Sequence, residues 1–463
     1  MMKLGEVKYD EVREKYGICE SYYVKLGQQA EGLLDFLLAI RDSTHAVILV
    51  TPQFIARCVI GLLCICKVSV ERVVEFFDSV LFYHVSKGRV GNIAEEKSKI
   101  AAEIMGGVSL ENIKNTAADE TFQQGKPIAV VVDLDTHFVP LLKPMRDRTG
   151  KTWEEICNEL KNRAFHPHLC VSDAGSGLLK GIPSAFPGIT MQLDVFHVLR
   201  DVGVYARRQE RRAFSELSEL CKLEYKVNSS KIRTKTKKRY EELLSSIDDT
   251  LLKADTLHIL LEWLRELTGF SGYGYALSFS LCIWILDEMA ALYPDNKKYQ
   301  YAISQFRERL PDTLKFLRRF QENLRDASNG LGIDEHDMML LYNQSAYPPY
   351  SKEYAAIEKR LYKRLGSRLI DARAALPDII RTTYRASSMI ENVNSRIRCY
   401  INLKREIPER FMPLLCLYLN TRKAIRPKNK NWVGTSALDR LTGHENPAFL
   451  DLLFGEPDYL IHV

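Results

Sequence analysis

Three acidic residues stand where a folded chain could gather carboxylates into one site. Asp119 lies in NTAADETF, a short strand candidate, and Asp173 directly follows the apolar run HLCVS, which predicts a buried strand. Glu391 lies in ASSMIENVNSRIR, which predicts a helix with a polar face. Carboxylates on rigid elements bind hard divalent cations such as Mg²⁺, and two such ions about 3.5–4 Å apart can serve phosphoryl transfer. The three acids therefore predict metal-assisted phosphoryl chemistry if the fold brings them together.

Two further acids, Asp133 and Asp135 in VVVDLDTHF, compete with Asp119 for the role of first ligand. If Asp119 lies on the first strand of a sheet, KPIAVVVDLDTHFVPLL can supply the second and third strands. If Asp133 were on the first strand, only residues 137–150 would remain for two more strands, which is too short. We therefore expect Asp119 to be the ligand.

The same segment leaves a second interpretation open. VVVDLDTHF resembles the DxD motif of haloacid-dehalogenase-type phosphatases, in which Asp133 would attack phosphorus and Asp135 would act as acid and base. The threonine of that family usually lies one position later than Thr136, however, and no lysine with an acidic pair follows in an α/β context. The basic helix around Glu391 also has no place in that fold, so this interpretation is the weaker one.

The predicted helix around Glu391 presents one polar face. Glu391, Asn394, Ser395 and Arg398 follow one another at i, i+3, i+4 and i+7, which places them on the same side of a helix. An acid beside amides and an arginine suits a metal ligand next to a phosphate clamp. A solvated helix face would show the same spacing, so the pattern alone does not decide.

The elements that must position these residues change in character along the chain. Helical spacing of apolar residues extends over residues 29–66. Between residues 108 and 202 the predicted order is strand, strand, strand, helix, strand, helix, strand, helix, which indicates a mixed α/β sheet flanked by helices. Long amphipathic segments over residues 203–380 predict an all-helical insertion, and residues 381–463 return to the core with the Glu391 helix and an amphipathic closing helix, ERFMPLLCLYLNTRKAI.

Residues 1–107 are expected to form an all-α region that binds DNA. Ser69 and Ser86 each predict a helix N-cap, and two short helices in sequence suit a helix-turn-helix. Lys87, Arg89 and Asn92 near the start of the second helix are then the expected DNA contacts. An ordinary small helical bundle is the alternative.

Composition and charge are those of a globular protein with basic segments. Hydrophobic residues make up 46% and charged residues 27% of the 463 residues, and the net charge is +6. No apolar run reaches the about 18 residues of a membrane span, and the ten scattered cysteines are typical of a reduced, intracellular protein. Two basic segments suit a polyanion. The residues expected to contact DNA there are Lys235, Lys237 and Lys238 in one segment, and Arg396 and Arg398 in the other.

Taken together, these motifs resemble those of a known class of enzymes. Asp119 in AADET, Asp173 in VSDAGSGLLKGI and Glu391 in SSMIENVNSRIR are similar in order and spacing to the DDE triad of transposases of bacterial and archaeal insertion sequences. FPGITMQLDVFHVLRD also resembles the segment that follows the second aspartate in Mutator-type transposases, where an acid or cysteine precedes a histidine; here these are Asp194 and His197. The resemblance covers about residues 50–445. The wide separation of Asp173 and Glu391 resembles the branches of the superfamily that carry a helical insertion there.

The resemblance carries definite expectations. It implies a ribonuclease-H-like catalytic core split by the all-α insertion, two Mg²⁺ or Mn²⁺ ions held by Asp119, Asp173 and Glu391, and auxiliary roles for Asp194, His197, Asn394 and Arg398. It implies cleavage and strand transfer of DNA, with terminal inverted repeats and target DNA as partners, a homodimer or larger homo-oligomer, and no membrane. A prokaryotic cytoplasm, at the nucleoid, is the expected location. A transposase-derived DNA-binding protein that has lost catalysis is the alternative.

Overall fold

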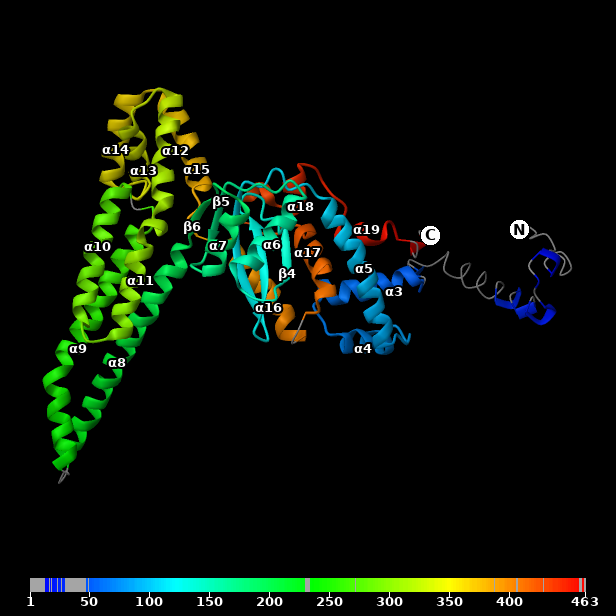
Figure 1. Ribbon diagram of the computed structural model, residues 1–463, viewed down its shortest axis with the longest axis horizontal. Helices are drawn as coiled ribbons and strands as arrows, with labels where there is room; N and C mark the ends of the chain where they lie inside the picture. The colour runs from blue at the N-terminus through cyan, green and yellow to red at the C-terminus, as the bar shows by residue number, and fades with distance from the viewer. Residues whose placement is uncertain are drawn as a thin grey trace.

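The computed structural model places a five-stranded sheet at the centre of the chain (Figure 1). The residues that it describes are 13–15, 17, 19–22, 24–25, 27–29, 47–48, 50–229, 234–270, 272–386, 388–404, 407–427, 429–457 and 460–461. Its strands are β2 (Asn115–Gln123), β3 (Lys126–Asp133), β4 (Leu141–Pro144), β5 (Leu169–Ser172) and β6 (Thr190–Leu193). Their spatial order is β4-β3-β2-β5-β6. The three predicted opening strands and the two later ones are thereby confirmed.

Both kinds of strand pairing occur in this sheet. β2 pairs antiparallel with β3, and β3 pairs antiparallel with β4, because short turns connect them. β5 and β6 lie parallel to β2, since helices α6 (Gly150–Lys161) and α7 (Ser176–Ala185) connect them. The central strand β2 is buried over Thr116–Thr121, which indicates that both of its faces are covered.

Helices cover the two faces of the sheet. α6 and α7 pack on one face, where the indole Nε1 of Trp153 donates to Glu120 Oε1 at 2.9 Å. The other face packs against α16 (Ser388–Lys404) and α17 (Met412–Thr421), which lie together in Figure 1. α17 is almost completely buried, so the predicted amphipathic closing helix is in fact a core helix, and it ends at Thr421 rather than at Ile425.

The N-terminal helices join the same hydrophobic core as the sheet. They are α3 (Pro52–Ile60), which runs into a π-helical turn (Gly61–Ile65), α4 (Val70–Val80) and α5 (Lys87–Gly107). The Ser69 and Ser86 side chains accept hydrogen bonds from the backbone N–H groups of Arg72 and Arg89, so both predicted N-caps are confirmed. α5 extends to Gly107, six residues beyond the expected helix of residues 87–101, and packs against α17.

The predicted helix over residues 29–66 is only partly right. Residues 30–46 lie outside the described residues, and Val47–Ile48 forms a short strand, β1, that pairs with β7 (Leu460–Ile461). Pairing with residues from the far end of the chain overrides the local helical spacing here. The C-terminal segment also includes α18 (Ala437–Thr442) and α19 (Phe449–Phe454).

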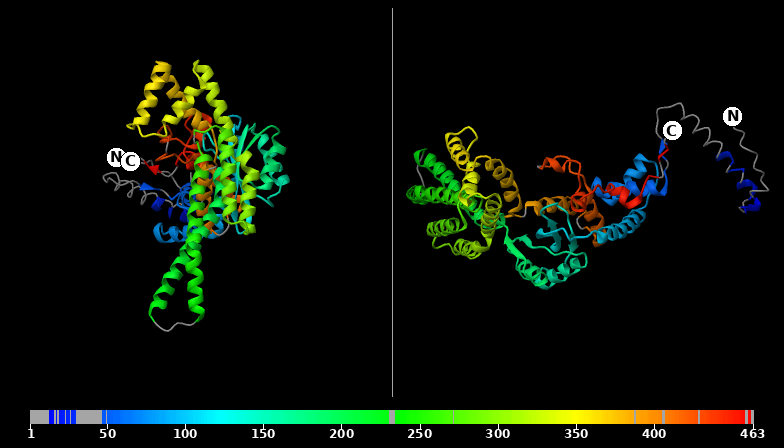
Figure 2. Two further views of the ribbon diagram at one scale, coloured as in Figure 1. Left: turned by 90° about the vertical axis from the view of Figure 1, so that its left-hand side faces the viewer. Right: turned by 90° about the horizontal axis from the view of Figure 1, so that it is seen from above.

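The insertion contains only helices and connecting loops in its described residues, as predicted, and its helices extend from Val195 to Thr382 rather than over the expected residues 203–380. It consists of α8 (Val195–Ser229), α9 (Thr234–Leu267), α10 (Tyr275–Leu292), α11 (Lys297–Thr313), α12 (Lys315–Leu331), α13 (Glu335–Gln344), α14 (Lys352–Leu365) and α15 (Arg368–Thr382). α8 and α9 form a long hairpin that projects away from the sheet, and the insertion and the N-terminal helices lie on opposite sides of the sheet (Figures 1 and 2). Its two ends meet, because Val195 N–H donates to the Arg385 carbonyl at 3.2 Å.

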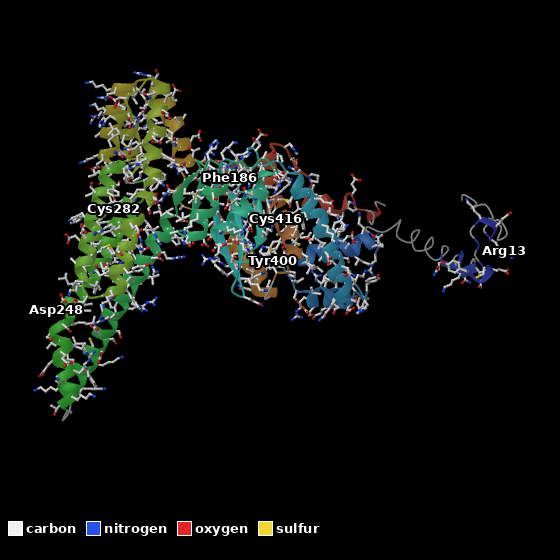
Figure 3. The ribbon with its side chains drawn as sticks, viewed as in Figure 1. Arg13, Phe186, Asp248, Cys282, Tyr400 and Cys416 are labelled. Carbon is white, nitrogen blue, oxygen red and sulfur yellow. The ribbon has the colours of Figure 1, made fainter. Side chains whose placement is uncertain are left out.

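Helix α10 of the insertion is rich in apolar residues. Among the described residues, α10 has the length and composition that would also suit a membrane span. Cys282, Ile285, Leu286 and Met289 of this helix are buried in the core of the insertion, with Cys282 visible there in Figure 3. Packing between helices therefore accounts for these four residues, whereas Leu277 and Trp284 of the same helix are exposed.

Two glycines allow α7 to lie directly against the start of α6. A Cβ atom at Gly177 would overlap the carbonyl oxygen of Arg148, and one at Gly181 would overlap the carbonyl oxygen of Gly150. Both neighbours are backbone atoms, which cannot rotate away. The glycine spacing in SGLLKG therefore fixes the start of the helix that follows Asp173.

We predict that Gly177→Ala destabilises the protein by about 2 kcal/mol, because overpacking forces the two helices apart. The measurement is urea unfolding of the full chain. The control is Gly330→Ala in α12, where a Cβ would meet no atom within 4 Å. That change is expected to be neutral or slightly stabilising, since alanine favours a helix over glycine. Equal effects of the two substitutions would contradict the proposed close packing.

Candidate active site

The register of the parallel strands places Asp119 beside Asp173. Ala118 of β2 pairs with Ser172 of β5, and each is followed by an aspartate. The pattern continues to the next strand, since Ser172 pairs with Leu193 and Asp194 N–H donates to the Ser172 carbonyl at 2.8 Å. Neighbouring strands lie about 4.8 Å apart. Three carboxylates therefore follow one another across three adjacent strands.

Asp119 is a buried carboxylate whose negative charge is only partly compensated by hydrogen bonds. Its side chain accepts hydrogen bonds from Asn394 Nδ2 at 2.7 Å and from the Glu120 backbone N–H at 2.8 Å. Burial is the main reason why the pKa of Asp119 is raised to about 6. The hydrogen bond from Glu120 lowers this pKa, and the nearby charge of Asp173 raises it. His197 lowers the pKa and Glu391 raises it by smaller amounts. The four groups are thus close enough to interact electrostatically.

Helix α16 delivers Glu391 and Asn394 to this point. Glu391 lies in the first turn, and its carboxylate is 3.9 Å from His197 Nε2 and 3.5 Å from Arg398 Nη1. His197 Nε2 is also 3.9 Å from Asp194 Oδ2. The imidazole thus lies between two carboxylates. Of the predicted polar face, Ser395 does not take part, because its hydroxyl donates to the Asn392 carbonyl of its own helix.

The start of α8 and the loop after β5 position the remaining groups. Asp194 accepts from Phe196 N–H at 2.8 Å as α8 begins, and this turn orients His197 one step later. Asp173 Oδ1 accepts from Gly175 N–H at 2.9 Å, which directs the carboxylate at the turn into α7. The predicted Asp119, Asp173, Asp194, His197, Glu391, Asn394 and Arg398 are all brought to one region of the fold.

Two polar atoms at this site are buried and lack a hydrogen-bond partner among the described residues. They are Asn394 Oδ1 and His197 Nδ1. Within the described part of the chain, no group of three or more His, Cys, Asp or Glu side chains is arranged as a metal cage. The donor set nevertheless fits a hard cation in its chemistry, because carboxylate and amide oxygens are the ligands such ions prefer. A cation would also relieve the mutual repulsion of Asp119, Asp173 and Glu391.

Asp133 and Asp135 do not belong to this site. Asp133 pairs with Thr116, whereas Asp119 pairs with Val130, so the two acids are separated by about 10 Å along the strands. The Asp133 carboxylate accepts from the backbone N–H and the hydroxyl of Thr136.

Asp135 accepts from Asn115 Nδ2 at 2.9 Å and from the Tyr384 hydroxyl at 2.5 Å. Both acids are thus engaged in fixing a turn. Tyr384 had no signal in the sequence, because it is far from Asp135 along the chain. β3 is moreover antiparallel to both of its neighbours, so Asp133 does not stand at the end of a central parallel strand, as a phosphatase nucleophile would require.

The residues expected to contact DNA lie in three separate places. Arg89 and Asn92 are exposed at the start of α5, and Lys87 pairs there with Glu71 at 3.2 Å. Arg396 is only half-buried beside Arg422, and burial lowers its pKa. The third group lies near the tip of the hairpin and consists of Lys235, Lys237 and Lys238, of which the last two pair with acids at i+4. Lys231 and Arg233 of the basic segment lie outside the described residues.

Part of the chain matches a known protein family. Residues 126–257 match the family model described as Transposase, Mutator family. The match begins at β3 and ends within α9, so it includes Asp173, Asp194 and His197 but neither Asp119 nor Glu391. No curated protein matches the chain. The match supports transposase function, which implies DNA as a partner.

The buried Asp133 gives a prediction for stability as a function of pH. Burial and the neighbouring Asp135 raise its pKa to about 6, against an ordinary value of 3.8. The folded protein therefore binds this proton more tightly than the unfolded chain, and the resulting stability is complete below pH 3.8 and is lost as the pH rises through 6.

Asp133→Asn removes this titration. Relative to the wild type, we expect the variant to gain on the order of 1 kcal/mol between pH 5 and pH 7.5. Urea unfolding at the two pH values measures this. A difference between the two proteins that is the same at both pH values would contradict the raised pKa.

Proposed function

We propose that this chain is a DDE transposase that cleaves DNA at the ends of a mobile element and joins those ends to target DNA. One observation carries the proposal. The parallel register sets Asp119 beside Asp173, and α16 brings Glu391 to His197, although the whole insertion separates β6 from α16. Three carboxylates from distant segments thus meet at one point of a sheet, as metal-assisted phosphoryl transfer needs.

The topology of the sheet supports a ribonuclease-H-like core. Three antiparallel strands are followed by two parallel ones in the order β4-β3-β2-β5-β6, with helices on both faces. We assign the catalytic core to residues 108–202 and 381–463, interrupted by the insertion of residues 203–380.

Asp119, Asp173 and Glu391 are proposed to hold two Mg²⁺ or Mn²⁺ ions. When bound, such ions activate the attacking oxygen and neutralise charge on the leaving oxygen of an in-line displacement. Asn394 donates to Asp119 and so holds this carboxylate toward the site. His197 lies between Asp194 and Glu391, where it can orient either acid or hold a phosphate. Arg398 is exposed beside Glu391, so its guanidinium can contact the DNA backbone.

Helices α4 and α5 are proposed to act as a helix-turn-helix that reads the terminal inverted repeats. Their support is the pair of capped helices and the exposed Arg89 and Asn92 near the start of α5. A homodimer or larger homo-oligomer is expected because two element ends must be joined to one target. The proposed location is the prokaryotic cytoplasm, at the nucleoid.

The second candidate is a transposase-derived DNA-binding protein without catalysis. Nicking of supercoiled plasmid DNA in Mg²⁺ or Mn²⁺ distinguishes the two. Asp119→Asn, Asp173→Asn and Glu391→Gln should each lower the nicking rate about 100-fold or more, because each removes a charge that binds the ions.

The matched control is Asp133→Asn, which removes another buried carboxylate, outside the site. Its nicking rate should stay within about threefold of the wild type, since this acid only fixes a turn. A wild-type protein that binds DNA but does not nick it with either ion would favour the second candidate. Equal losses in Asp133→Asn and Asp119→Asn would sink the site assignment.

A further inference from the structure

The helix that carries His197 continues far beyond the active site. α8 extends over 35 residues and forms one side of the hairpin that projects from the body of the molecule (Figures 1 and 2). Asp248, on the partner helix α9, lies on this projecting part in Figure 3. A helix of this length needs a reason beyond positioning one histidine.

One face of α8 is basic along most of its length. Starting from His197, positions follow at steps of three or four residues, which keeps them on one side of a helix. We name this face the α8 ridge; its members are Arg200, Val204, Arg208, Arg211, Ser215, Ser218 and Lys222, with Arg207 at its edge. All of these side chains are exposed, and none is acidic.

Three of the five acids of α8 form ion pairs, whereas Glu210 and Glu224 have none within the described part of the chain. Glu216 pairs with Arg212 at 2.8 Å, and Glu219 pairs with Arg239 of α9 at 2.9 Å. At the base of the helix, Asp201 is 3.9 Å from Arg200, so this first cation of the ridge is paired, unlike those that follow it. In the described part of the chain, no ion pair involves Arg207, Arg208, Arg211 or Lys222.

On a helix face that contacts only solvent, exposed cations are paired with acids of the same helix. α9 is the example within the same hairpin: Lys237, Lys238 and Lys253 each pair with an acid one turn away on their own helix. Such pairs stabilise an isolated helix, whereas like charges at this spacing destabilise it by similar amounts. Arg207 and Arg211 stand one turn apart, and neither forms an ion pair in the described part of the chain, although the exposed Glu210 lies between them in the sequence. The ridge therefore holds repelling charges that a bound polyanion would neutralise.

The ridge also has the length and position for one particular polyanion. Arg200 and Lys222 are separated by about 33 Å along the helix, which is close to one turn of B-form DNA, about 34 Å. The first member lies one helical step from His197, which is 3.9 Å from Glu391. A DNA backbone that leaves the active site on this side would meet Arg200 next.

We propose that the α8 ridge binds the phosphate backbone of duplex DNA over about one helical turn next to the active site. The proposal rests on the proposed function for the identity of the DNA. The contacts are to phosphates, so they hold and orient the duplex without reading its sequence.

The test uses the full chain and a random-sequence 40-base-pair duplex in a buffer with EDTA, so that cleavage does not interfere. The triple variant R208Q/R211Q/K222Q should bind this duplex about 10-fold or more weakly at 0.1 M salt. The slope of log K against log salt should fall by about 2–3, since each phosphate contact contributes about 0.9. Glutamine keeps the helix propensity of α8, and a thermal melt checks the fold.

The matched control is R212Q/R239Q/K253Q, which removes three positive charges from the same hairpin that are already paired with acids. Its salt slope should equal that of the wild type. The ridge proposal is overturned if the two triple variants lose affinity equally, or if the ridge variant keeps the wild-type slope.

The outcomes also separate this proposal from the proposed function. A wild-type protein that nicks DNA, with a ridge variant that binds normally, sinks the ridge and leaves the enzyme. A ridge variant that loses binding, in a chain that never nicks DNA, leaves the binding surface and sinks the enzyme. A wild-type chain that does not bind duplex DNA overturns both.

Discussion

The parallel pairing of β2 with β5 is the constraint on which the candidate site depends. It opposes Ala118 to Ser172 and so makes neighbours of the two aspartates that follow them. A shift of one residue would turn one of these side chains to the opposite face of the sheet. The register is held from both sides: β3 fixes β2 through eight antiparallel pairs, and the glycine contact of α7 with α6 fixes the segment after β5. The other groups of the site are arranged around these two aspartates.

The two adjacent acids of β2, Glu120 and Asp119, are both buried but differ in the groups that surround their carboxylates. Glu120 points toward α6, where Trp153 and Arg148 donate to its carboxylate, so its charge is compensated and it fixes a helix to the sheet. Asp119 points toward α16, where Asn394 donates to it but Asp173 and Glu391 add negative charge. The fold therefore satisfies one acid and leaves the other under repulsion. Groups with perturbed pKa values gather at functional sites. Because Asp133 has a similarly raised pKa in a turn, it is the proximity of Asp173, Glu391 and His197, rather than the pKa of Asp119 alone, that supports the site.

Local patterns predicted the elements of the core well, because strand length, turns and N-caps are each determined by residues that are close together in the sequence. The choice of Asp119 over Asp133 followed from the space that three strands require.

What the sequence could not show is the long-range pairing. The bond from Asn394 to Asp119, the contact of His197 with Glu391, and the hydroxyl of Tyr384 on Asp135 all join segments that only folding brings together. The short strand at Val47–Ile48 was missed for the same reason, since its partner lies near the other end of the chain. The ridge on α8 did have a signal, the spacing of arginines in RDVGVYARRQERR, but it needs the exposure of each side chain to be interpreted.

The large insertion next to the candidate site leaves the core elements in place because its two ends meet. Val195 N–H donates to the Arg385 carbonyl, so the insertion begins and ends at one point, and the core elements on either side of it, β6 and α16, can stay next to each other. The entropic cost of closing such a loop grows only slowly with the number of residues in it. Yet the point of attachment lies between Asp194 and His197 on one side and the approach to α16 on the other. The first helix of the insertion therefore holds a site residue and, further along the same face, the unpaired cations of the ridge. DNA held on the ridge, as we propose, would therefore be bound by the same continuous helix that brings His197 to the carboxylates.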